Sequence, residues 1–213
     1  MARYTGPREK LERRIGEKIG LKGERSNSPK SALVRRPYPP GQHGPSRRPR
    51  KLSEFGQQLK SKQKVRYMYR LMEKTFKSYI KKALANKKQS PYETILRMLE
   101  LRLDNVVYRS GFAQSRDQAR QIVNHGHITL NGKRAKTPSI AVKVGDTIGI
   151  REQSMGSPYF GILMPRWFAD HTAPGWISLD KEKPTATVKS SPSADESGIQ
   201  LPDLQAIIEY YSR

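Results

Sequence analysis

Arginines recur between Arg102 and Glu152 in a spacing that could bind phosphate groups. Arg116, Arg120 and Asn124 share one stripe of a helix, because residues three and four apart lie on the same helix face. A guanidinium group can donate two parallel hydrogen bonds to a phosphate. The pattern therefore indicates a polyanion partner, with an ordinary solvated helix face as the alternative.

Local signals predict the helix that carries this stripe. Ser115 stands three residues before Gln118, the spacing of a capping box, so the helix should begin at Arg116. Ala119, Ile122 and Val123 follow at helical spacing and are expected to face a core, which would leave the arginine stripe in water.

A turn signal follows the helix. Asn131-Gly132 tolerates positive φ and separates residues 127–130 from residues 133–136, which predicts a two-residue β-hairpin. Residues 102–152 should therefore form a small RNA-binding module of two helices and a hairpin.

The charge of the whole chain favours the polyanion interpretation. Its 213 residues include 41 Lys and Arg against 19 Asp and Glu, which gives a net charge of +22 and an isoelectric point near 10.3. Residues 1–100 hold 27 basic and 8 acidic side chains, whereas residues 153–213 hold 5 and 7. A nucleic-acid surface is therefore expected on the first two thirds of the chain.

Patterning divides the chain into four parts within an α+β fold. Residues 1–50 are rich in Gly, Pro and Arg and predict an extended basic N-terminal arm, mostly coil with one or two helical turns. Residues 51–101 should form a mostly helical domain, with two helices between Ser53 and Asn86 and a third starting at Pro91. Residues 102–152 are the RNA-binding module. Residues 153–213 are predicted to form a loop-rich segment that packs back on the helical domain and ends in a short strand or helix.

Several function classes are disfavoured. No stretch approaches the length of a membrane-spanning helix, no cysteine is present, and the N-terminus lacks the apolar core of a secretory signal, so an intracellular compartment is expected. Asp104 is better explained by pairing with Arg102 or Arg109 than by catalysis. A chromosome-associated basic protein remains an alternative, which competition between RNA and duplex DNA would test.

Five separated strings resemble one family. They are RYTGP from Arg3, RPYPPGQHG from Arg36, KQKVRYMY from Lys62, RLDNVVYRSGF through ARQIVNHGHITLNGK from Arg102, and IEYYSR at the C-terminus. With these strings the chain resembles the bacterial-type small-subunit ribosomal protein S-four family. Modules similar to residues 102–152 also occur in pseudouridine synthases and some tyrosyl-tRNA synthetases, but no catalytic domain follows here.

The resemblance implies a primary binder of small-subunit ribosomal RNA that nucleates assembly of the subunit body. It also implies a contribution to translational accuracy with the fifth and twelfth small-subunit proteins, and the third is a further candidate neighbour. Members lie near the entrance of the mRNA channel, and some repress their own messenger RNA. The expected location is the ribosomal small subunit in the cytoplasm, or in the stroma or matrix of an organelle.

The chain departs from the family where many members bind zinc. The resemblance places the four zinc cysteines at Glu9, Glu12, Ser26 and Ser31. Serine hydroxyls are poor zinc ligands, so an arm without metal is expected, and no cofactor is predicted. Four tyrosines could stack on unpaired bases instead of packing in a core, namely Tyr38, Tyr4, Tyr67 and Tyr69.

Charge and resemblance together give a set of expected RNA contacts. In the first 70 residues these are Arg3, Tyr4, Arg8, Arg13, Arg14, Lys22, Arg35, Arg36, Tyr38, Gln42, His43, Arg47, Arg48, Lys60, Lys62, Lys64, Arg66 and Arg70. In the module they are Arg102, Ser115, Arg116, Arg120, Asn124, His125, His127, Asn131 and Lys133.

Overall fold

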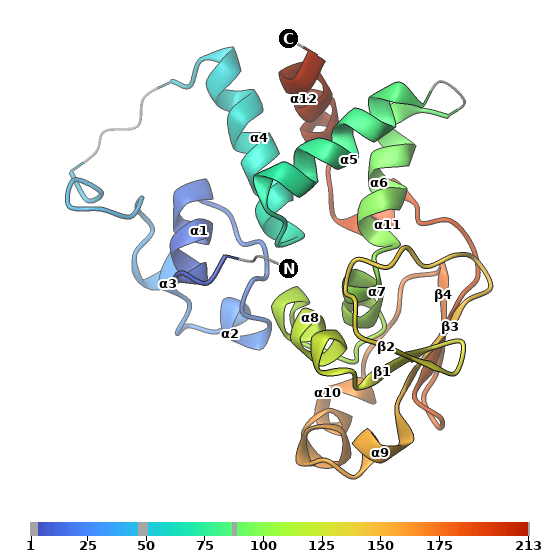
Figure 1. Cartoon of the computed structure of the whole chain (residues 1–213). Helices are drawn as coiled ribbons and strands as arrows, with labels where there is room; N and C mark the ends of the chain where they lie inside the picture. Colours follow the sequence, from blue (N-terminus) through green and yellow to red (C-terminus); the bar gives the residue numbers. More distant parts are fainter. Residues whose placement is uncertain (1–3, 47–50, 87–88, 213) are drawn as a thin grey trace. The chain divides into compact units, whose positions relative to one another are not determined.

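The first part of the chain is helical and the later part combines an antiparallel sheet with further helices, in a computed structural model that describes residues 4–46, 51–86 and 89–212 (Figure 1). The chain divides into two units. Unit 1 comprises Met1–Ile95 with Gly198–Arg213, and unit 2 comprises Leu96–Ser197. This architecture confirms the predicted α+β class.

Unit 1 is helical in its described parts. Its helices are α1 (Arg8–Ile15), α2 (Glu24–Asn27), α3 (Ala32–Arg35), α4 (Glu54–Met68), α5 (Glu73–Ala85), the first half of α6 (Pro91–Glu100) and α12 (Leu201–Ser212). The two consecutive helices expected before Asn86 are confirmed as α4 and α5, and the start at Pro91 as α6. The C-terminal segment is a helix, one of the two predicted alternatives.

The N-terminal arm is more ordered than its composition indicates. Where coil with one or two helical turns was expected, residues 4–46 contain α1, α2 and α3. Leu11, Ile19 and Leu21 are buried together and Tyr67 packs against them. These apolar residues come from one helix and the loop after it, so they leave no helical period in the sequence. The expectation of coil with only one or two helical turns is therefore wrong for this segment.

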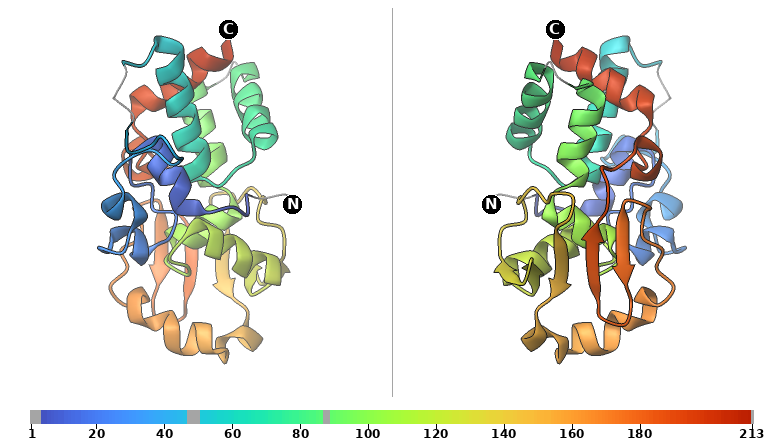
Figure 2. Two further views of the ribbon diagram at one scale, coloured as in Figure 1. Left: turned by 90° about the vertical axis from the view of Figure 1, so that its left-hand side faces the viewer. Right: turned by 90° about the vertical axis from the view of Figure 1, so that its right-hand side faces the viewer.

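α4 and α12 are neighbours although they are far apart in the sequence (Figures 1 and 2). Ser53 caps α4, because its Oγ accepts a hydrogen bond from the backbone N–H of Gly56 at 3.2 Å. Gln58 on α4 donates to the carboxylate of Glu209 on α12 at 3.0 Å. The C-terminal helix is thus part of the helical unit.

Unit 2 contains the predicted module and a larger sheet. Its elements are the end of α6, α7 (Leu103–Arg109), α8 (Arg116–His125), β1 (Ile128–Leu130), β2 (Lys133–Ala135), β3 (Thr147–Ile150), α9 (Glu152–Met155), the π-helix η1 (Tyr159–Leu163), α10 (Pro165–Phe168), β4 (Ile177–Asp180), β5 (Thr185–Val188) and α11 (Ala194–Ser197). Its buried core draws on α7, α8, the sheet and the segment around Phe160 and Trp176.

The helix start and the hairpin of the module are confirmed. Ser115 Oγ accepts from the backbone N–H of Gln118 at 3.3 Å, and α8 begins at Arg116. The Gln118 side chain closes the cap one residue further back than in a capping box, since its Oε1 accepts from the N–H of Gln114 at 2.9 Å. Asn131 and Gly132 turn the hairpin with φ of 50° and 75°.

The sheet has five antiparallel strands in the order β2-β1-β3-β5-β4. Ile148 of β3 pairs with Leu130 of β1 on one side and with Ala186 of β5 on the other. The β4–β5 hairpin therefore extends the sheet of the module (Figure 2). The expectation that all of residues 153–213 pack back on the helical domain is corrected: residues 153–197 belong to unit 2, because their strands pair with β3, and the chain returns to unit 1 only from Gly198.

No helix within the described ranges is long and apolar enough to cross a lipid bilayer.

Candidate nucleic-acid interface

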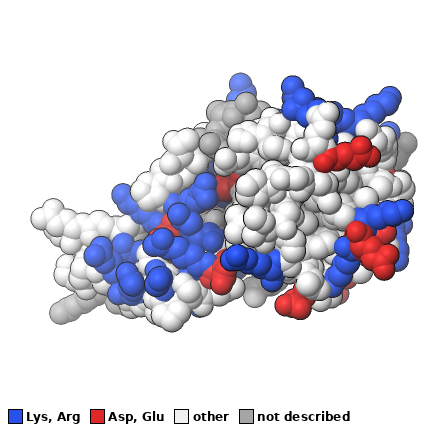
Figure 3. Space-filling view, turned by 90° about the horizontal axis from the view of Figure 1, so that it is seen from below, with Lys and Arg blue, Asp and Glu red and all other residues white. Residues whose placement is uncertain are grey.

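The exposed predicted contacts fall in both units. In unit 1 they are Tyr4, Arg14, Lys22, Arg35, Arg36, Gln42 and His43, and in unit 2 they are Asn124, His125, Asn131 and Lys133. Lys and Arg side chains gather over the N-terminal helices in Figure 3. Arg8 is half-buried, and Arg3, Arg47 and Arg48 lie outside the described residues.

Arg13 holds the loop that follows α3. Its Nε lies 3.1 Å from the carbonyl oxygens of both Arg36 and Tyr38, and its Nη2 donates to Pro39 O at 3.3 Å. The same guanidinium lies 4.9 Å from the centre of the Tyr38 ring. Arg13 therefore positions the exposed Arg36 and already covers one face of the ring predicted to stack on a base.

The other predicted stacking residues also have partners within the protein. The guanidinium of Arg66 lies 4.6 Å from the Tyr67 ring centre, and that of Arg70 lies 5.5 Å from the Tyr4 ring centre. Tyr69 is buried. These rings contribute to the packing of unit 1.

Lysines of α4 are used inside unit 1. Lys64 bridges Glu17 at 2.8 Å and Asp203 at 2.9 Å, and Lys60 lies 3.4 Å from Glu17. Burial opposes the charge of Lys64, but its hydrogen bonds to the two carboxylates prevail and raise the pKa of the ammonium. The bond from Lys64 is also the main reason that the pKa of Glu17 lies below its usual value. This network links α4 to α12 and to the segment after α1.

A second network joins α4, α5 and α12. Lys62 is buried, pairs with Glu73 at 2.9 Å and lies 4.6 Å from the Tyr210 ring centre. Tyr211 donates its hydroxyl hydrogen to the same Glu73 carboxylate at 2.6 Å. Arg66 contacts that carboxylate at 3.5 Å. Lys62 and Arg66 are thus fixed within the protein, although the sequence indicates RNA contacts there.

Arg70 is buried too. Its Nη2 donates to the carbonyl oxygen of Tyr4 at 3.1 Å, which ties the start of the chain to the end of α4.

The predicted arginine stripe of α8 is not uniformly exposed to solvent. Arg120 is only 4% exposed, and its Nη1 lies 4.0 Å from the Asp104 carboxylate. Arg102, 2% exposed, binds the same carboxylate through Nε at 3.0 Å and Nη2 at 2.6 Å. The expectation that Arg120 stays in water is wrong, because Asp104 in the first turn of α7 lies within reach of it. Asp104 pairs with Arg102, the first of the two predicted partners.

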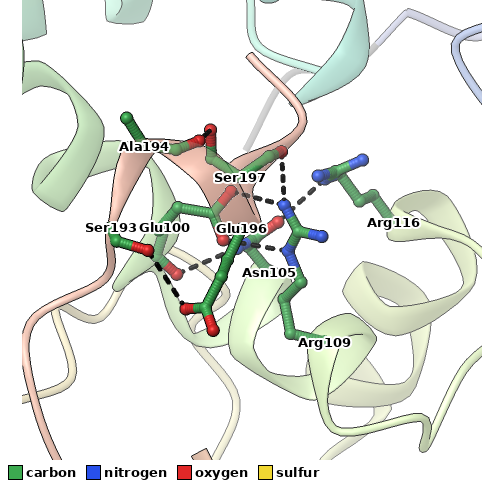
Figure 4. Close-up of polar contacts among 8 residues, drawn as sticks. All are labelled: Glu100, Asn105, Arg109, Arg116, Ser193, Ala194, Glu196 and Ser197. Atoms are coloured by element: carbon green, nitrogen blue, oxygen red, sulfur yellow. Dashed lines mark hydrogen bonds and ion pairs between the residues drawn. The ribbon is translucent and has the colours of Figure 1, made fainter. Parts of the chain in front are cut away.

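Arg109 instead pairs with Glu100 (Figure 4). Its Nε and Nη2 lie 3.0 and 2.8 Å from the carboxylate oxygens, and Nη2 also donates to Ser197 O at 2.6 Å. Asn105 donates to Glu100 at 2.8 Å and accepts from Arg116 Nε at 2.8 Å. Arg116 is therefore half-buried and oriented by α7, with its guanidinium 4.6 Å from the Tyr108 ring centre.

The hairpin turn is fastened to β3. Asn131 accepts from the Thr147 N–H and donates to Asp146, both at 2.8 Å. The bond from Asn131 lowers the pKa of Asp146 most, and the N–H of Lys143 lowers it further. The Asn131 amide therefore serves the fold, whereas neighbouring Lys133 is exposed.

The contacts predicted from the sequence leave out four exposed lysines of α5 and the exposed Arg134. Lys74, Lys77, Lys81 and Lys82 line an open groove of about 380 Å³ on α5. Their helical spacing, on the face away from the buried Phe76, could have indicated them. Arg134 is exposed and donates to the carbonyl oxygens of His125 and Gly126 at 3.1 and 3.0 Å, where it caps the end of α8.

The positions that the resemblance assigns to zinc carry hydrogen bonds and an ion pair. Glu12 is buried and accepts from the Leu21 N–H at 3.0 Å, and Ser26 accepts from the Lys22 N–H at 3.0 Å. Glu9 pairs with Arg25 at 3.2 Å, and Ser31 is buried just before α3. Within the described part of the chain, no three His, Cys, Asp or Glu side chains are grouped so that they could hold a metal ion.

Known families match both parts of the chain. The model of the ribosomal protein S4/S9 N-terminal domain matches residues 3–100, and that of the S4 domain matches residues 101–148. The small ribosomal subunit protein uS4 of Desulfitobacterium hafniense is 49% identical over 214 residues, and that of Pelotomaculum thermopropionicum is 46% identical over 213. The protein of that name in Roseiflexus castenholzii is 45% identical over 217 residues, and each alignment covers 100% of both chains. With its helical unit, its S4-type module and full-length similarity to these proteins, the chain belongs to the uS4 family of small ribosomal subunit proteins.

Proposed function

We propose that this chain is a primary binder of small-subunit ribosomal RNA, that it nucleates assembly of the subunit body, and that it contributes to translational accuracy. The chain is a structural ribosomal protein and not an enzyme. The observation that carries the proposal is a division among its cations. Cations inside the fold pair with carboxylates. A second set is exposed, and in the described ranges no carboxylate pairs with its members, which are Arg14, Lys22, Arg35, Arg36 and the four α5 lysines.

This division supports RNA binding by shape as well as by charge. The Lys62–Glu73 pair ties α5 to α4, and Arg13 holds the loop that contains Arg36, so the exposed cations of α5 and of that loop are held in place within unit 1. Rigid placement suits a folded RNA, which proteins recognise largely through its shape and its phosphates. A chromosomal role would need duplex DNA to bind equally well.

The salt dependence of binding tests the proposal. Each phosphate contact should contribute about −0.7 to −0.9 to the slope of log K against log salt. Replacement of Lys74, Lys77, Lys81 and Lys82 by Ala should flatten that slope by about three, whereas replacement by Arg should preserve it. A slope near zero for the unmodified chain, or equal competition by duplex DNA and ribosomal RNA, would refute RNA binding.

The partners implied by family membership are part of the same proposal. They are the fifth and twelfth small-subunit proteins, the third as a further candidate, and messenger RNA at the entrance of its channel. Membership in the family supports these contacts, and crosslinking within reconstituted small subunits tests them. Repression of the chain's own messenger RNA would require that this RNA compete with ribosomal RNA for the purified protein.

A further inference from the structure

Unit 2 contains a pocket lined by two of the predicted RNA contacts, His125 and His127. It has a volume of about 390 Å³ and lies between α8 and the segment that leads into η1. Gln118, Gln121 and His125 line it from α8, and His127, Ser157 and Phe160 are among the residues opposite. Its size suits one planar heterocycle.

Aromatic side chains form part of its wall and are held in place. The His127 ring lies 5.8 Å from that of Phe160 and 5.9 Å from that of His125, both edge-to-face. Tyr159 also lines the pocket, lies 4.8 Å from Phe160 and donates its hydroxyl hydrogen to Phe112 O at 2.9 Å. His127 Nδ1 lies 3.0 Å from Ser154 Oγ. The stacking surface is therefore present before any ligand arrives.

Polar groups lie beside this wall. Gln121 is exposed on α8, and the Gln118 carbonyl accepts from Gln114, which leaves its amide nitrogen as a donor. The Ser157 hydroxyl is buried, and no described group hydrogen-bonds to it. A buried unsatisfied hydroxyl is costly, and rotation of this short side chain could offer it to a ligand. Amides and a hydroxyl match the donor and acceptor edge of a nucleobase.

The charge near the pocket is positive. Arg134 caps the end of α8 beside His125, and Arg134 and Arg151 both exert a positive potential on His127. Cations beside an aromatic pocket fit a nucleotide, because the base can stack while its phosphate meets a guanidinium. An apolar peptide side chain would gain nothing from these charges.

We propose that this pocket binds one unpaired nucleobase of the bound RNA, with the adjoining phosphate toward Arg134. The inference rests on the proposed RNA-binding function and deepens it. The base would stack against His127, whose ring Phe160 supports edge-to-face, and hydrogen-bond to Gln121.

The test uses the full chain and short single-stranded oligoribonucleotides of each base, with abasic oligomers of equal length as the phosphate-only arm. Intact oligomers should shift the NMR signals of the His125 and His127 imidazoles, and abasic oligomers should not. Gln121→Ala should weaken the binding of the preferred oligomer about 3- to 10-fold, as expected for one lost hydrogen bond. The matched control is Gln153→Ala, an exposed glutamine outside the pocket, which should leave binding unchanged.

Equal shifts with abasic oligomers would show that only phosphates bind there and would overturn the proposal. Imidazoles that do not respond to any oligomer, while ribosomal RNA still binds with a steep salt dependence, would refute the pocket and leave the proposed function intact. If the full chain bound neither the oligomers nor ribosomal RNA, both the pocket proposal and the proposed function would be refuted.

Discussion

Arg109 and Glu100 form a two-point ion pair in which the carboxylate side chain is 0% exposed and the guanidinium also holds the carbonyl of Ser197. This single arginine therefore neutralises a buried charge and ties α11 to α7.

Arg109→Ala should destabilise the protein by about 3–5 kcal/mol, because it leaves a buried carboxylate without its cation. Urea unfolding checks the value. Arg166→Ala, an exposed arginine on α10, serves as the control and should change the free energy of unfolding by less than about 0.5 kcal/mol. Equal effects of the two variants would contradict the structural role of Arg109.

Arg120→Ala should lower the melting temperature, whereas Asn124→Ala on the same helix should not. Arg120 is buried near Asp104, and Asn124 is exposed. The free energy of unfolding should fall by about 1–3 kcal/mol, less than for Arg109→Ala, because Arg102 still neutralises the Asp104 carboxylate. Calorimetry with an RNA-binding assay separates the roles: unchanged melting with weaker binding would show that Arg120 acts at the RNA surface.

Stability should fall as the pH drops through the titration of His127. Burial first, then the charges of His125, Arg134 and Arg151, lower the pKa of His127 from 6.5. At pH values between the lowered folded-state pKa and 6.5, the unfolded chain binds more protons than the folded chain does. The free energy of unfolding therefore rises with pH across this window and levels off above about pH 6.5. His127→Asn should flatten this dependence when unfolding is measured across the window, and an unchanged slope would contradict the assignment.

Glu12→Ala should loosen the N-terminal helices in the free protein. The Glu12 carboxylate accepts from the buried Leu21 N–H, and an orphaned buried donor costs about 1–3 kcal/mol. Amide exchange at Leu21 should be slow in the unmodified chain and faster in the variant. Lys10→Ala, on the exposed side of α1, is the control. Fast exchange at Leu21 in both proteins would show that this segment is not folded before it binds RNA.

Local signals predicted the elements whose conformation is decided by adjacent residues. Ser115 caps its helix as its spacing to Gln118 predicted, and Asn131-Gly132 adopts the positive φ that its turn requires. These features depend on a few neighbouring residues, so the sequence alone indicates them.

Ion pairs and strand pairs between separate elements could not be predicted in the same way. The sequence shows Arg120 and Lys62 as basic residues on a basic chain, and only the fold brings them to Asp104 and Glu73. The place of the β4–β5 hairpin in the module's sheet was missed for a related reason, since β5 pairs with β3 across more than 30 residues of intervening chain. The sequence therefore predicts the kind of interface better than the individual residues in it.

One edge of the sheet bears on the solubility of the free protein. β2 is a sheet edge of three residues, and its Lys133 and Arg134 are exposed. A second copy that tried to add its own β2 there would bring like charges together along unpaired backbone groups. The basic residues of this edge should therefore also discourage self-association and fibril growth while newly made protein waits for RNA.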